Sequence, residues 1–202
     1  MPPGRGNPRR PAFLTPAALE ALAGTVDPVQ EIEAAHETAA VLVRTGRAAN
    51  DPAVTARLVA LVEEMGLSAV ADLWASRPAR SLPGALWRLY ALREWVHRAP
   101  EEASADYSAG IRFTVVNHAV AGVAEPPGPQ ELTALTDAVL TGVFEGELDV
   151  ALERAAAFCR VVAAGRADRS DGEALANRAA ALLATGEDLK GCAALWRSGE
   201  LT

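Results

Sequence analysis

The chain has 202 residues, half of them apolar but only 5% aromatic, and carries a net charge of −7 at pH 7. This acidic balance argues against a surface that binds nucleic acid, because phosphate contacts need clustered Lys and Arg. No apolar run approaches the ~18 residues of a membrane span. The two cysteines are too few for a disulfide scaffold. We therefore expect a cytoplasmic protein that has no membrane segment.

Residues 1–12 are rich in proline and glycine, and no hydrophobic segment follows the Arg9-Arg10 pair. This pattern does not fit a secretory or twin-arginine signal, and we predict a disordered N-terminal tail. Lys190 is the only lysine among the 19 basic residues, a bias typical of GC-rich bacteria.

Proline repeatedly follows a capping residue or a turn, which is the pattern of a helix start, because the first helical N–H needs no partner. Glycines such as Gly46 and Gly66 then serve as predicted helix stops. The segment Arg112–Val120 holds the β-branched cluster Thr114-Val115-Val116, which is compatible with a strand, but among helical neighbours we expect a buried helix. In the first half of the chain, we predict helices at about 15–23, 28–44, 52–66, 68–76, 82–98 and, briefly, from 100.

The proline-rich segment 125–129 is the clearest boundary in the chain, since no helix or central strand tolerates its composition. We predict a helical bundle over 13–124 and a second helical region over 130–202 that packs on the first. The second region is expected to hold helices at about 129–144, 147–164, 171–184 and 187–197, with Gly146, Gly165 and Gly186 as stops. The predicted fold class is all-α, a bundle of about eight to ten short-to-medium helices in one body or two helical subdomains.

One pattern indicates metal chemistry, since Glu33 and His36 share the spacing Glu-x-x-His with Glu94 and His97. Residues three apart lie on one helical face, so each pair can present a carboxylate and an imidazole to one metal ion. The spacing resembles the motif of ferritin-like di-iron bundles. That resemblance implies two further glutamates, for which the candidates are Glu20 and either Glu63 or Glu64. A metal-binding bundle of this kind would hold iron, manganese or zinc, with His118 as a spare ligand.

The alternative for these histidines is a structural role. His36 projects with Val29, Ile32, Ala39 and Val43, in the middle of an apolar stripe. A core imidazole that is hydrogen bonded to a carboxylate or a carbonyl would explain this position without any metal.

The segment 82–98 is apolar over most of its circumference and carries Trp87, Tyr90 and Trp95. Such a helix must be covered, so it is either the central helix of the fold or part of an interface. The periodicity predicts that Trp87 and Trp95 lie on different sides of it.

We expect a non-enzymatic helical module, regulatory or scaffolding, that binds another protein or a second copy of itself through this helix. The alternative is a metal-binding bundle of the oxidoreductase class that uses the two Glu-x-x-His pairs. A third hypothesis is a helix-turn-helix at Leu67–Arg80, which the net charge disfavours.

Overall fold

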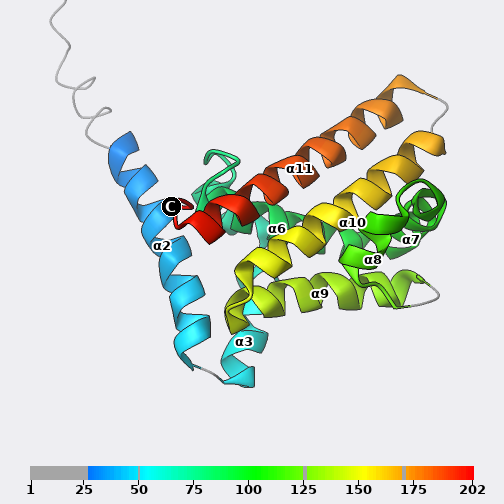
Figure 1. Cartoon of the computed structure of the whole chain (residues 1–202). Coiled ribbons are helices and arrows are strands. Elements are labelled where there is room, and N and C mark those ends of the chain that lie inside the picture. The colour runs from blue at the N-terminus through cyan, green and yellow to red at the C-terminus, as the bar shows by residue number, and fades with distance from the viewer. Residues whose placement is uncertain (1–26, 50, 125–126, 170–171) are drawn as a thin grey trace, which may run out of the picture.

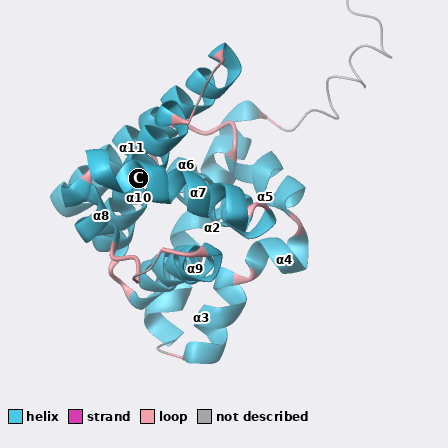
Figure 2. Ribbon diagram, turned by 90° about the vertical axis from the view of Figure 1, so that its right-hand side faces the viewer, coloured by secondary structure: helices cyan, strands magenta, loops and turns pink. Residues whose placement is uncertain are grey.

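A computed structural model describes residues 27–49, 51–124, 127–169 and 172–202, apart from the side chains of 62, 63 and 67. The described residues form an all-α multi-helix bundle, and none of them is in a β-strand (Figure 2). The predicted fold class is therefore confirmed. The predicted tail (1–12) and the first predicted helix (15–23) lie outside the described residues.

The helices follow one another through short connections, and α10 and α11 lie side by side, with α2 at one end of the molecule (Figure 1). In chain order, the elements are α2 (Pro28–Ala49), α3 (Pro52–Val59), α4 (Leu61–Met65), α5 (Leu67–Trp74), α6 (Leu82–Arg98), α7 (Pro100–Gly110), the 3₁₀ turn η1 (Ile111–Phe113), α8 (Val115–Ala121), α9 (Pro129–Glu145), α10 (Leu148–Asp168) and α11 (Glu173–Ser198).

The helix starts lie where the proline pattern predicts them. Asp51 caps α3, because its side chain accepts a hydrogen bond from the Ala53 N–H at 2.8 Å. Ser81 caps α6 in the same way and accepts from the Gly84 N–H at 3.2 Å. Both caps use a side-chain oxygen to satisfy an N–H of the first turn, which fixes the start of the helix locally.

Several predicted helix stops are wrong, because the glycines concerned lie inside helices. A Cβ atom at Gly46 would lie 2.7 Å from the Phe144 Cβ, so this glycine lets α2 pack closely on α9. A Cβ atom at Gly186 would lie 3.0 Å from the Ala156 carbonyl oxygen, and α11 continues through it as one helix instead of two. Only Gly66 and Gly146, with φ of 85° and 102°, end or separate helices as expected.

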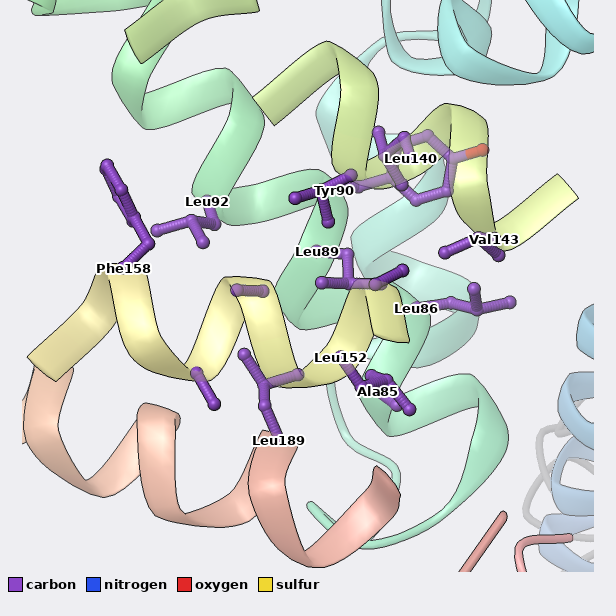
Figure 3. Packing of buried hydrophobic residues seen from close by; sticks show 14 of the residues in the cluster. Ala85, Leu86, Leu89, Tyr90, Leu92, Leu140, Val143, Leu152, Phe158 and Leu189 are labelled. Carbon is purple, nitrogen blue, oxygen red and sulfur yellow. The ribbon is translucent and has the colours of Figure 1, made fainter. Parts of the chain in front are cut away.

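Helix α10 lies at the centre of the bundle, where it contacts α6, α7, α8, α9, α11 and η1. It can do so because much of its surface consists of small side chains such as Ala155, Ala156 and Ala157, which are buried and let other helices approach. Figure 3 shows the larger core side chains between them, with Leu89 from α6, Leu140 from α9, Leu152 from α10 and Leu189 from α11.

The closest helix crossing joins α7 to α10. A Cβ atom at Gly110 would overlap the Val161 carbonyl oxygen, and one at Gly165 would overlap the Asp106 carbonyl oxygen. The two backbones therefore touch at a point where only glycine fits. Beside this point the buried Asp106 accepts hydrogen bonds from Arg166 at 2.7 Å and from Arg169 at 2.5 Å.

The helices before and after the proline-rich connector contact one another, with α6 and α7 both packed on α9 and α10. The end of the connector is held as well, since the Ser104 hydroxyl donates to the Pro127 carbonyl oxygen at 2.9 Å. Residues 125 and 126 lie outside the described residues, and the domain boundaries at 13–124 and 130–202 stay predictions.

The substitution Gly165→Ala should destabilise the protein by at least about 2 kcal/mol, because the added methyl group forces the two touching backbones apart. Gly142→Ala is the matched control: this helical glycine has only the Ala151 Cβ, at 3.8 Å, near its added methyl group. The control should gain up to about 1 kcal/mol from helix propensity. Urea unfolding measures both changes, and equal effects would show that the crossing is not close.

Arg197 should stabilise the α10–α11 pair in a pH-dependent way. It donates to Asp149 at 2.8 Å and to Glu153 at 2.6 Å, and these hydrogen bonds hold the pKa of both carboxyl groups below their usual values. The stabilisation is therefore present above the unfolded pKa of about 4 and is lost as the pH falls through the folded pKa.

We expect Arg197→Gln to lower the melting temperature slightly at pH 7, with the difference from the unsubstituted protein vanishing at a pH well below 4 and in high salt. Arg178→Gln, which removes an exposed arginine of α11, is the control and should show no such dependence. A difference that grows toward low pH would contradict the assignment.

Candidate functional site

The first Glu-x-x-His pair lies on α2, with Glu33 exposed and His36 half-buried. His36 lines a cavity of about 410 Å³ together with Arg44 and Arg47 of the same helix, Leu82 of α6, and Trp196 next to the C-terminal end of α11. The pair therefore does not present both side chains to one enclosed site.

The second pair, on α6, uses its side chains separately. Glu94 pairs with Arg98 at 2.6 Å, one turn along the same helix. The His97 Nε2 lies 3.0 Å from an Asp137 carboxylate oxygen, and the Arg93 Nε donates to that same oxygen at 2.6 Å. Asp137 thus joins two side chains of α6 to α9, which is the structural role that the alternative interpretation gives to a histidine.

Among the described residues, no three His, Cys, Asp or Glu side chains gather closely enough to hold a metal ion. The candidate glutamates do not complete a metal site among the described residues, since Glu20 and the side chain of Glu63 lie outside the described part and Glu64 is exposed. His118 has a different partner, with its Nδ1 2.9 Å from the Tyr107 hydroxyl. The iron, manganese or zinc site stays a prediction that the geometry does not favour.

The three aromatic residues of α6 divide into two kinds. Tyr90 is fully buried, its hydroxyl donates to the Leu58 carbonyl oxygen at 2.5 Å, and burial raises its pKa well above the usual value. Trp87 and Trp95 are half-buried and line one hollow of about 340 Å³, with Ala91 between them. The prediction that the two tryptophans lie on different sides of the helix is therefore wrong, because residues at i, i+4 and i+8 form one continuous stripe.

The hollow beside Trp87 and Trp95 also contains two arginines, and each already has an anionic partner. The Arg166 guanidinium lies 4.9 Å from the centre of the Trp95 ring and bonds to Asp106 and Glu102. Arg88 donates to the Gly84 carbonyl oxygen at 2.9 Å and lies 3.7 Å from Asp188. The hollow thus offers indole surfaces to a ligand, while its charges serve the packing of α6, α7, α10 and α11.

Neither cysteine is placed as a nucleophile. Cys159 is fully buried, and burial raises its pKa to about 12. Burial also raises the pKa of Cys192 to about 11, and its Sγ lies 3.5 Å from the Ala79 carbonyl oxygen as a weak donor. Both are free thiols that stay protonated at neutral pH.

The segment Leu67–Arg80, the candidate for a helix-turn-helix, holds the one helix α5. Its two arginines face carboxylates, since Arg77 lies 3.8 Å from Glu31 and Arg80 lies 3.5 Å from Asp188. Two arginines, each beside a carboxylate, do not form the cluster of cations that phosphate contacts need.

The two most exposed large apolar side chains in the described chain lie on α8. Val116 is 76% exposed and Val115 is 66% exposed, and Phe113 and Val120, close to them in sequence, are exposed as well. We call Phe113, Val115, Val116 and Val120 the α8 surface. The helix at this position is confirmed, but its expected burial is wrong: the buried residue of α8 is Ala121, while the valines point outward.

The sequence contains one signal for this surface, the run Thr114-Val115-Val116. Adjacent β-branched residues occupy more than one face of a helix, so a helix of seven residues cannot bury all of them against a single neighbour. The contact between α8 and α10 leaves Val115 and Val116 exposed, and no sequence pattern fixes which side of α8 makes this contact.

No protein-family model, curated protein or solved structure matches this chain. No described helix is both long enough and apolar enough to span a membrane.

The buried Asp106 should be far more important for stability than its half-exposed neighbour Glu102, although both bond to Arg166. Asp106→Asn leaves a buried guanidinium without its main counter-charge and should cost about 3–5 kcal/mol. Glu102→Gln removes a partner that solvent can replace and should cost at most about 1 kcal/mol. Urea unfolding of the two variants measures the difference, and equal costs would show that Asp106 is not the main counter-charge.

Proposed function

We propose that this protein is a non-enzymatic interaction module that binds another protein, or a second copy of itself, through the α8 surface. The observation that carries the proposal is the concentration of exposed apolar side chains between Phe113 and Val120. Single exposed apolar residues such as Val150 and Leu183 are ordinary on a soluble protein. Four large exposed apolar side chains within eight consecutive residues exceed such scattered exposure and favour an interaction site.

The α8 surface is held in place by buried contacts behind it. The Tyr107 hydroxyl bonds to His118, and the Tyr107 ring stacks on Phe158 of α10 with 5.5 Å between the ring centres. The Arg154 Nε donates to the Ala121 carbonyl oxygen at 3.1 Å, at the end of α8. A surface fixed in this way loses little conformational entropy on binding, which favours affinity.

The surroundings of the patch also suit a protein partner. Arg112 lies 4.6 Å from the centre of the Phe113 ring and pairs with Asp168 at 2.5 Å. An apolar centre with a polar, charged rim is the usual anatomy of a protein interface. The two buried free thiols support a reducing compartment and hence the cytoplasm, and the expected role stays regulatory or scaffolding.

A photo-reactive amino acid at position 116 should give a discrete cross-linked protein adduct in the cells that produce this chain. Position 150 is the matched control, because Val150 is an exposed valine and no other large exposed apolar residue of the described chain lies near it in sequence, and it should give no such adduct. Val115→Asp should abolish the adduct from position 116. Its melting temperature should change little, since exposed substitutions usually cost within about 0.5 kcal/mol.

An adduct of twice the mass of the chain would identify a second copy as the partner, and an adduct of another mass would identify a different protein. The proposal is overturned if positions 116 and 150 give the same products, or if Val115→Asp leaves the adduct unchanged.

A further inference from the structure

A second apolar feature is a groove between α2, α4 and α5, in the first half of the chain. The groove has a volume of about 420 Å³ and is lined mainly by apolar side chains, among them Val41, Leu42, Leu61, Met65, Leu73 and Trp74. Val41 and Met65, at 48% and 58% exposed, leave it open to solvent. We call this the α2 groove.

The polar groups of the α2 groove give a small ligand little to bind. The Thr38 hydroxyl donates to the Ala34 carbonyl oxygen at 2.7 Å and accepts from the Trp74 Nε1 at 3.2 Å. Glu37 is exposed and lies at the rim. An apolar groove with no inward-facing polar group favours the apolar face of a helix as its occupant.

We infer that the occupant of the α2 groove is the chain's own segment 13–24, which docks there as a short helix. The sequence predicts a helix from Thr15 to Ala23, started by the Thr15-Pro16 pair. Within it, Ala18 and Leu22 are four residues apart and Leu19 lies between them, so the three form an apolar face.

The length of the segment fits the groove. The residues of α2 that line it, Ala34 to Leu42, span about 12 Å at 1.5 Å per residue, and a helix over 16–23 is about 11 Å long. The connecting residues 24–27 extend to about 13 Å, enough for the chain to reverse direction before Pro28 and run back along α2.

Charge supports the same occupant. Residues 1–19 contain Arg5, Arg9 and Arg10 and no acidic residue. The groove has the exposed Glu37 at its rim, and Glu33 on α2 and Glu64 on α4, next in sequence to the lining residues Ala34 and Met65, are exposed as well. A basic extension next to an apolar helix therefore matches an acidic border next to an apolar groove.

Because the segment and the α2 groove belong to the same chain, even weak binding is enough to fill the groove. A short linker gives the segment an effective concentration in the millimolar range, so an interaction with a millimolar dissociation constant already fills the groove about half of the time. Docking covers Val41 and Met65, which makes the α2 groove an intramolecular contact, separate from the α8 surface.

Cysteine cross-linking in the full chain tests this inference. The variant Ala18→Cys with Met65→Cys places one thiol on the apolar face of the segment and one in the groove. The control, Ala18→Cys with Val116→Cys, uses an exposed apolar position on α8 instead. The native cysteines are buried, so a short bismaleimide reagent reacts first with the introduced thiols.

We expect the first variant to form an intramolecular cross-link at least about tenfold faster than the control, and Leu22→Glu to reduce its rate to that of the control, because a carboxylate on the apolar face opposes docking. Circular dichroism checks that each variant keeps its helices. Equal rates for the two pairs, or no effect of Leu22→Glu, would overturn the inference. Cross-linked dimers as the main product would overturn it too, by placing a second copy in the groove.

Discussion

The backbone contact between α7 and α10 is the constraint on which the rest of the structure depends. Gly110 and Gly165 meet where no side chain fits, and Asp106 with Arg166 forms a buried ion pair beside them. A buried ion pair adds little net stability, but it penalises any other register strongly, because a shifted helix would leave a charge without its partner. Glycine sets how close the two helices come, and the ion pair sets how they are aligned.

This alignment determines where the candidate surfaces lie. Helix α7 ends at Gly110, so η1 and α8 begin at the crossing and fold back on α10, which leaves Val115 and Val116 on the outside. On the other side of Arg166, the ring of Trp95 lies over the same guanidinium that bonds to Asp106. The crossing thus positions both the α8 surface and the hollow beside Trp87 and Trp95.

Helix starts could be predicted from the sequence because their causes are local: Asp51 and Ser81 each bond to an N–H two or three residues away. Helix ends could be predicted only in part, because Gly66 and Gly146 end or separate helices, whereas Gly46, Gly165 and Gly186 are required by contacts with residues far away in sequence. A composition pattern does not distinguish these two roles. The exposure of Val115 has the same origin. The helix that contains Val115 could be predicted, but the face of α8 that packs on α10 could not, because it depends on the crossing at Gly165. The spacing of Glu94 and His97 was visible, but their partners Arg98 and Asp137 were not.

The central position of α10 is tested most directly by native-state hydrogen exchange of the full chain, which reports the free energy of opening for each helix. We expect the amides of Ala155–Val162 to exchange last, because they open only when the contacts with α6, α7, α8, α9 and α11 are lost together. The amides of α8 and of the first turns of α2 should exchange much earlier. If α10 exchanges as early as α8 while α6 stays protected, the bundle is organised around α6, and the role given to the crossing of α7 and α10 is wrong.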